Sequence, residues 1–313
     1  MSIARHLRPL IGSLLILVIG GCAGALEDAA IGTTSGILVR AQPALNQESD
    51  YQLAHDAIPG ALKTIEGFWI ANPDKAGVLV PLLTEGFCQY GTAFVEDDWE
   101  IATFAKKLDE IAYHNVRASH IFTRCLNYAL RTLGSRWQKE LFGTTDQVTK
   151  LVKDTSSDQR TAMMWVALAL GSIINHNLNR VEMLSYLPTV RLILDRVLAI
   201  DAKSEPHDKQ MAALPHIALG MILTGASPQF GGDPKKAQTE FELALKLTDN
   251  KMLLARTLMA YRVGLMTNDR KFFHDQLKMV LETDPAVWPE QRLANEVAHR
   301  RARRYLSHEK EKF

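Results

Sequence analysis

The chain has 313 residues, of which 47% are hydrophobic and 23% charged, and its 36 Lys and Arg nearly balance its 35 Asp and Glu. This composition is typical of a folded globular protein with a sizeable core, and it excludes a disordered chain, which would be poorer in aliphatic residues. The balanced charge argues against nucleic-acid binding through a basic surface, so we expect no nucleic-acid partner.

Residues 1–21 have the pattern of an export signal. Arg5 and Arg8 precede an apolar run from Leu10 to Ile19, after which small residues follow. A charged segment, a short apolar segment and small residues together form a secretory signal peptide. The run is shorter than the ~20 apolar residues that a membrane-spanning helix needs.

The string Ile19-Gly20-Gly21-Cys22 resembles a bacterial lipobox, in which the cysteine thiol receives a diacylglycerol and becomes the first mature residue. The alternative is an ordinary signal peptide with an incidental cysteine. The mature chain would carry slightly more acidic than basic residues, so acyl chains, rather than charge, would have to hold it on a membrane. Ala23 follows the cysteine where an Asp would favour inner-membrane retention in enterobacteria-like sorting, so we expect the outer rather than the inner membrane.

Residues 22–48 are small and polar with little periodicity, and we interpret them as a lipidated tether. The run Ile37-Leu38-Val39 could be a strand, but the chain contains no partner run for it. We expect residues 49–313 to fold as a single domain.

From about Asp50 the apolar residues recur with the period of a helix, and no alternating segment of useful length is present. Asp50 can cap the first helix, and Pro59 inside that helix should kink or divide it. In the second helix, over 78–95, Gly86 and Gly91 would let a neighbouring helix approach closely. Further helices are predicted, in chain order, over 99–115, 117–133, 136–142, 145–153, 158–177, 181–184, 188–200, 206–224, 234–247, 250–267, 270–282 and 288–308. The sequence therefore predicts an all-α fold.

Cys88 and Cys125 could form a disulfide in an oxidising compartment. Both lie in apolar helical stretches, where a free cysteine usually behaves as a small buried hydrophobe. We favour this second interpretation.

Several helices carry a degenerate tetratricopeptide pattern, in which small and large residues alternate at fixed helical spacings. Ala237, Phe241 and Ala244 fit it well, since a small residue lets paired helices touch and a large one fills the groove between them. Three further segments match more loosely, beginning at Ala61, Val190 and Phe273. We predict a helical bundle or superhelix of degenerate tetratricopeptide-like pairs.

Two stretches, residues 57–100 and 214–306, and the motif Gly231-Gly232 followed by Ala237, Phe241 and Ala244-Leu245 carry a family resemblance. They resemble the T-components of TRAP transporters, which are periplasmic lipoproteins built on cryptic tetratricopeptide repeats. The resemblance implies a binding role: association with a periplasmic solute-binding P-component, a homotrimer, and an internal cavity for a hydrophobic or organic-acid ligand. The alternative function is a tetratricopeptide scaffold lipoprotein in outer-membrane or envelope assembly.

The sequence contains neither a Gly-x-Ser-x-Gly elbow nor a phosphate-binding Gly-x₄-Gly-Lys-Ser/Thr loop nor a His-Glu-x-x-His motif. Its ten His are scattered, and His114 and His120 fall on different faces of a helix. We therefore expect no enzyme activity, no cofactor and no metal site.

Two groups of apolar side chains are candidates for ligand contacts. Met163 and Trp165 lie in a segment that is apolar all round, as in a buried central helix. Phe87, Tyr90 and Phe94 share one helix face, which usually indicates core. If a cavity exists, we expect these five side chains to line it.

Two charged runs complete the set of candidates. Glu96, Asp97, Asp98 and Glu100 begin a helix, where carboxylates are favoured by the macrodipole, and we interpret them as a solvated face. The run 299–304 on the last helix is basic. There, Arg301 and Arg304 could contact an anion or a partner, although a solvated or salt-bridged face is the favoured interpretation.

Overall fold

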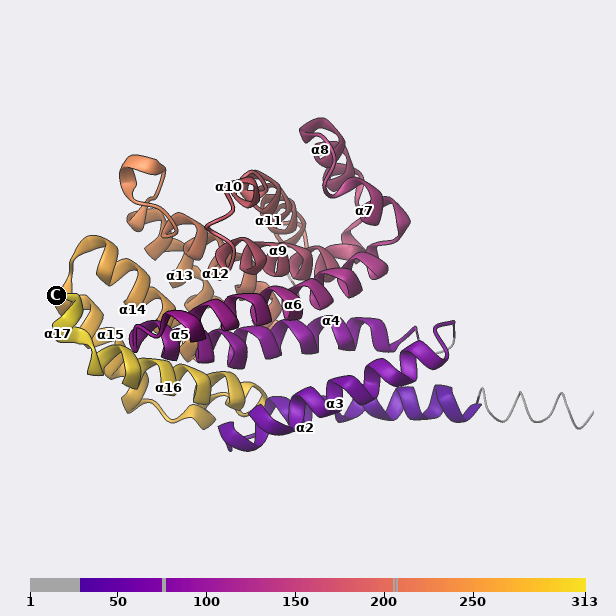
Figure 1. Ribbon diagram of the computed structural model, residues 1–313, viewed down its shortest axis with the longest axis horizontal. Coiled ribbons are helices and arrows are strands. Elements are labelled where there is room, and N and C mark those ends of the chain that lie inside the picture. The colour runs from indigo at the N-terminus through magenta and orange to yellow at the C-terminus, as the bar shows by residue number, and fades with distance from the viewer. Residues whose placement is uncertain (1–28, 75–76, 205, 207) are drawn as a thin grey trace, which may run out of the picture.

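The computed structural model describes residues 29–74, 77–204, 206 and 208–313. Within these ranges every regular element is a helix, so the predicted all-α class is confirmed (Figure 1). The predicted signal peptide and Cys22 lie outside the described residues. Among the helices described, none combines the length and the apolar character that crossing a bilayer requires.

Residues 29–41 are helical and lead into the short α2 (Pro43–Asn46), so the strand considered for 37–39 is wrong. Ile31, Leu38 and Val39 pack against the main hydrophobic core. Burial of these few apolar side chains explains the helix, because a spacing of seven and eight residues, about two helical turns, puts them along one side of it. The segment between Cys22 and the domain thus contains regular structure from residue 29.

The N-terminal half is built from long helices. α3 (Tyr51–Ala71) begins at Asp50, whose carboxylate accepts hydrogen bonds from two backbone N–H groups, and it continues through Pro59. α4 (Leu79–Tyr90) runs through a π-helical turn, Gly91–Val95, directly into α5 (Glu96–Phe104).

α6 (Leu108–Leu133) is a single helix of 26 residues, whereas the sequence predicted two helices, over 99–115 and 117–133. The chain instead breaks at 105–107, where Lys106 takes a left-handed conformation with φ 57°. No Gly or Pro marks this turn, so the sequence carried no sign of it, and the predicted break lies about ten residues too late.

The remaining helices continue the chain to its C-terminus. They are α7 (Ser135–Glu140), α8 (Thr145–Asp154), α9 (Arg160–Asn175), α10 (Val181–Leu184), α11 (Leu187–Asp201), α12 (Lys209–Leu223), α13 (Pro234–Leu247), α14 (Leu253–Thr267), α15 (Arg270–Glu282), α16 (Arg292–Ser307) and α17 (Glu309–Lys312).

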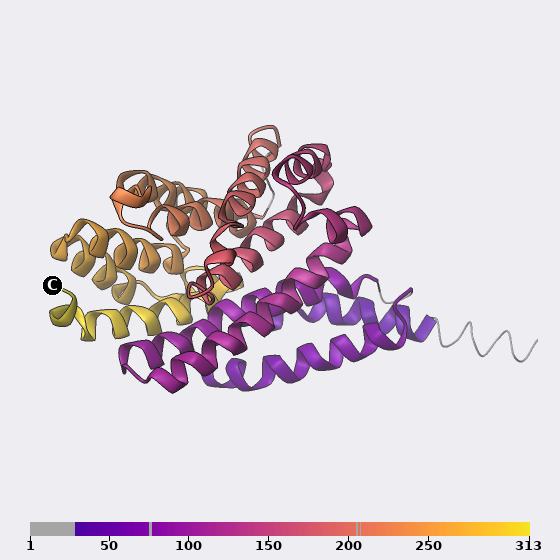
Figure 2. The same ribbon diagram turned by 45° about the horizontal axis from the view of Figure 1, so that its top comes forward.

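Consecutive helices α12 to α15 stack side by side at the C-terminal end (Figure 2). Two glycines lie at the closest approaches in this stack. A Cβ on Gly220 of α12 would lie 2.7 Å from the ring of Phe241 in α13, and a Cβ on Gly264 of α14 would lie 2.9 Å from the Cβ of Phe273 in α15. Each large ring therefore occupies the space that its partner glycine leaves open.

The predicted close approach at Gly86 and Gly91 is also present. A Cβ on Gly86 would overlap the side chain of Leu62 in α3, and a Cβ on Gly91 would lie 2.8 Å from the ring of Phe122 in α6. These contacts hold α4 between α3 and α6.

Cys88 and Cys125 form a disulfide between α4 and α6. The interpretation as two free buried thiols is therefore wrong. Their Cα atoms lie 5.3 Å apart across two helices that pack side by side, within the usual range for a disulfide. A sequence separation of 37 residues carries no sign of that contact.

α16 connects the two halves of the molecule. It packs on α14 and α15 on one side and reaches α2 and α3 on the other, as Figure 1 shows for the yellow C-terminal helix. The last core cluster, around Phe273, Ala298 and Tyr305, lies between α14, α15 and α16.

Candidate functional site

The side chains predicted to line an apolar cavity all lie inside the main hydrophobic core, and each is at most 4% exposed. They are Phe87, Tyr90, Phe94, Met163 and Trp165. Aromatic neighbours fill the space around the first three, since the ring of Phe87 stacks 6.0 Å from that of Tyr128 and Phe94 lies 5.5 Å from Tyr90. These residues stabilise the fold by burial, and a ligand cavity at this place stays a prediction.

The acidic run of α5 meets the basic run of α16. Asp97 is fully buried and accepts hydrogen bonds from Nε of Arg300 at 2.6 Å and from Arg304. Arg304 also donates to Glu100. The predicted solvated face is therefore wrong at Asp97, because α16 arrives from 203 positions further along the chain.

The π-helical turn before α5 supplies a further hydrogen-bond acceptor to this charged cluster. The backbone N–H of Glu96 donates to the carbonyl of Gly91, five residues earlier. In an α-helix it would donate to the carbonyl of Thr92 instead, so that carbonyl is left without its usual donor. The freed carbonyl of Thr92 accepts a hydrogen bond from Nη2 of Arg301 at 2.6 Å. The widened turn thus anchors a guanidinium that is only 2% exposed.

The buried charges in this cluster remain ionised. Burial alone would raise the pKa of Asp97, but Arg304 and Arg301 outweigh burial and hold that pKa below its usual value. The hydroxyl of Tyr51 donates to Asp97 at 3.1 Å, and burial together with the Asp97 charge raises the pKa of Tyr51. An external anion could reach Arg301 or Arg304 only by displacing these carboxylates.

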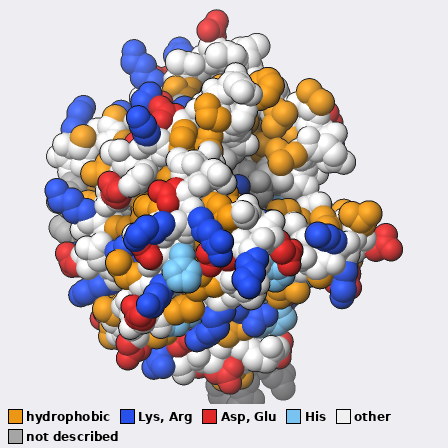
Figure 3. All heavy atoms as spheres, turned by 90° about the vertical axis from the view of Figure 1, so that its left-hand side faces the viewer, with side chains coloured by type: hydrophobic (Ala, Val, Ile, Leu, Met, Phe, Trp, Pro, Cys, Tyr) orange, Lys and Arg blue, Asp and Glu red, His pale blue; other side chains and the backbone are white. Residues whose placement is uncertain are grey.

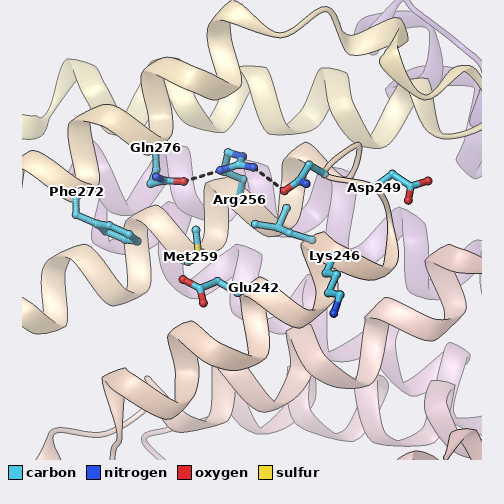
Figure 4. Close-up of a pocket in the computed structure, with 9 residues that line it drawn as sticks. Glu242, Lys246, Asp249, Arg256, Met259, Phe272 and Gln276 are labelled. Carbon is cyan, nitrogen blue, oxygen red and sulfur yellow. Dashed lines mark hydrogen bonds between the residues drawn. The ribbon is translucent and has the colours of Figure 1, made fainter.

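A groove of about 390 Å³ opens between α13, α14 and α15 (Figure 4). Leu245, Met259 and Phe272 form its apolar part. Its polar part includes Glu242 and Arg256. The volume is near the lower end of the range for small-molecule sites, roughly 300–1,000 Å³.

Arg256 is held in this groove by neutral groups. Its Nη1 donates to Oε1 of Gln276 at 2.7 Å, and its Nη2 donates to Oδ1 of Asn250 at 3.0 Å. Burial lowers the pKa of Arg256, and among the described residues no carboxylate offsets that effect. The guanidinium is therefore oriented without being neutralised.

Family comparison decides the class of protein to which these features belong. Residues 47–313 match the model of the TRAP transporter T-component. The chain belongs to the TRAP transporter T-component family. A search of curated proteins returned no match.

The family match takes in the T-component's helical body from α3 to α17, including the α5–α16 ion pairs and the groove. The helix over 29–41 and α2 precede it. The family match therefore covers the helical body from α3 onward, and it assigns the T-component to a transport system.

Sequence reasoning missed the groove around Arg256. Its two polar partners come from separate segments: Gln276 from α15, and Asn250 from the turn before α14. The sequence offered only the residue types Asp249 and Asn250 after α13. In the structure both take left-handed conformations, with φ 51° and φ 62°. Asn is the residue type that tolerates this conformation best after Gly, but nothing in the spacing pairs Asn250 with Arg256 across a groove.

Charged side chains of both signs cover the end of the T-component that carries its C-terminus, with Lys and Arg gathered across the middle (Figure 3). Several of them form pairs between helices. Arg270 and His274 of α15 both contact Glu309 of α17, at 2.8 and 2.9 Å. Across the described parts of the chain, no group of three His, Cys, Asp or Glu side chains has the arrangement of a metal site.

Proposed function

We propose that this T-component is a lipid-anchored, periplasm-facing accessory subunit that docks the solute-binding P-component of a TRAP system. The observation that carries the proposal is the family match over residues 47–313. The homotrimer and the ligand are finer proposals that come from the family resemblance. Docking requires a surface that presents side chains to a partner, and one loop of the T-component does so.

The loop between α12 and α13 projects from the body (Figure 1) and presents Phe230, which is 83% exposed. The loop is internally bonded: the N–H of Asp233 donates to the carbonyl of Leu223 at 2.9 Å, and that of Gly232 to Ser227 at 3.1 Å. An aromatic side chain on a pre-ordered loop can anchor a protein interface at low entropic cost. We include Phe230 in the proposed docking surface.

The docking proposal is tested with the purified T-component and its cognate P-component. Native mass spectrometry and light scattering should show a defined complex at tens of micromolar, with the T-component itself as a trimer. The absence of any complex under these conditions would favour the alternative, a scaffold lipoprotein in envelope assembly, for which repeat surfaces that bind proteins are equally suited.

Cys22 is the proposed site of lipidation, and Ala23 favours the outer membrane. A Cys22→Ala variant expressed in a Gram-negative host should accumulate as unprocessed or soluble protein. The lipobox interpretation is wrong if this variant still partitions quantitatively into Triton X-114, because acyl chains are what would carry it there.

The helix pairs α12–α13 and α14–α15 are proposed as degenerate tetratricopeptide units. Ala237, Phe241 and Ala244 are all fully buried, and the ring of Phe241 faces Gly220. These are the small and large positions of the pattern. Their burial supports the assignment for this unit more directly than for the N-terminal half.

A further inference from the structure

The Arg256 guanidinium has hydrogen-bonding capacity that the described residues do not use. Arginine carries five N–H donors, and only two hydrogen bonds, to Gln276 and Asn250, involve this side chain. Both acceptors are amide oxygens, so they fix the plane of the guanidinium and leave its positive charge in place. A planar, fixed and uncompensated guanidinium is suited to bidentate binding of a carboxylate.

The wall beside Arg256 is apolar. Met259 and Leu245 are nearly buried at 3% and 4% exposure, and with Phe272 they line the groove next to the guanidinium (Figure 4). Burial of ligand hydrocarbon against this wall would favour binding, chiefly at Phe272, which is half-buried. Recognition is therefore directed to a molecule with an apolar body and one anionic end.

The charges around the groove set its polarity. In Figure 4 Met259 lies between Arg256 and Glu242, and Glu242 accepts a hydrogen bond from Gln238 at 2.8 Å. A second carboxylate on the Met259 side would face Glu242 and be repelled. Lys246 and Asp249 also line the groove, and Asp249 is paired with Lys209. Beside Met259 the groove therefore favours the hydrocarbon of a monocarboxylate over a second anionic group.

We propose that the groove between α13, α14 and α15 binds a small organic monocarboxylate, with its carboxylate on Arg256 and its hydrocarbon on Met259 and Phe272. The inference rests on the ligand part of the proposed function, moves the ligand from the core residues around Phe87 that the sequence predicted to this groove, and does not depend on docking of a P-component.

The test measures binding of hexanoate and of hexanamide, its neutral counterpart, to the full chain in detergent micelles by ligand-observed NMR. Empty micelles serve as the blank. Hexanoate should bind at least ten-fold more tightly than hexanamide, and added salt should weaken the binding of hexanoate but not that of hexanamide. Equal binding of the two ligands would overturn the proposal, since the charge would then play no part.

Two variants locate the site. Arg256→Gln should lose at least ten-fold in hexanoate affinity, whereas Glu242→Gln, which removes a like charge from the same groove, should bind hexanoate as tightly as the native protein or more so. Unchanged binding in Arg256→Gln, or loss in Glu242→Gln alone, would contradict the assignment. If Arg256→Gln does not fold, Arg256→Lys should keep the charge, lose the fork geometry and bind with intermediate affinity.

The docking experiment separates the two proposals. A T-component that forms the complex but does not bind hexanoate refutes the groove alone. One that binds hexanoate through Arg256 but forms no complex refutes docking alone.

Discussion

Asp97 is the residue on which the contact between α5 and α16 depends most. Its buried carboxylate accepts hydrogen bonds from Arg300, Arg304 and Tyr51. The charges are brought together by packing of α16 against the N-terminal half. Taking these groups out of water is costly, so the cluster is stable only while every charge keeps its partner.

Replacing Asp97 by Asn should therefore be strongly destabilising. The variant leaves guanidinium groups buried with less compensation, and we expect a loss of about 3–5 kcal/mol in the free energy of unfolding, measured by urea denaturation. Asp98 is the matched control: it pairs with Arg117, both side chains are about a quarter exposed, and Asp98→Asn should cost less than about 1 kcal/mol. Equal effects of the two variants would contradict the role given to Asp97.

The same residue predicts a pH dependence. The folded-state pKa of Asp97 lies below its usual value, so its contribution to stability is present above the unfolded pKa, about 3.9, and is lost as pH falls through the lower folded pKa. The free energy of unfolding should drop below about pH 4. In Asp97→Asn that part of the drop should be absent. If the free energy of unfolding of the variant falls with pH as steeply as that of the native protein, Asp97 is not the group responsible.

At the scale of elements, helices are joined by contacts of two kinds. The disulfide between Cys88 and Cys125 links α4 to α6 covalently. The pairs α12–α13 and α14–α15 approach closely at small residues, where Phe241 packs against Gly220 and Phe273 packs against Gly264. The disulfide stabilises the protein largely by reducing the conformational entropy of the unfolded chain, whereas close packing stabilises the folded state through contacts.

Removal of the disulfide should destabilise the N-terminal half. A Cys88→Ala, Cys125→Ala double variant should lose about 2–4 kcal/mol, as expected for closure of a loop of this size, in urea denaturation under non-reducing conditions. In the native protein, mass spectrometry after denaturation and alkylation should find neither thiol modified. Modification of both without reductant would contradict the disulfide.

Ala244 tests the packing of α13. Its side chain is fully buried, so Ala244→Trp must accommodate an indole and should cost more than the ~1–3 kcal/mol typical of added methylenes. The neighbouring Leu243 is 38% exposed, and Leu243→Trp should change the melting temperature little. A melting temperature of Ala244→Trp within a degree of the native value would remove the tetratricopeptide assignment for this unit.

At the scale of the whole molecule, α16 ties the helical stack of the C-terminal end to the long N-terminal helices. Its ion pairs with α5 join residues about 200 positions apart. The loop that carries Phe230 projects from the resulting body. An aromatic side chain that projects from a packed body on an internally bonded loop is suited to docking a partner without refolding.

Phe230→Ala should weaken docking of the P-component at least ten-fold, because interface aromatics commonly contribute more than about 1.4 kcal/mol. The highly exposed side chain contributes little to the core, so the melting temperature should stay unchanged. Leu108→Ala provides the control: Leu108 is 78% exposed at the start of α6 and should leave the affinity as it is. Full affinity in Phe230→Ala would exclude this loop from the docking surface.

The sequence by itself determined the helical class and most helix positions, because apolar periodicity and caps such as Asp50 act within a few residues. The same local reasoning placed Gly86 and Gly91 at helix contacts and led to the T-component family. It misjudged Cys88 and Cys125, whose pairing depends on which helices become neighbours.

Only the tertiary structure decided the charged sites. Glu96 to Glu100 and the arginines of α16 each looked like a solvated or salt-bridged helix face, since charges near helix ends are favoured locally. Whether such charges face water or one another depends on a contact between residues about 200 positions apart. The Arg256 groove has the same origin, because the side chains that orient this guanidinium come from α15 and from the turn before α14. Short-range patterns carry no information about which separated segments meet, and packing of the whole chain supplies it.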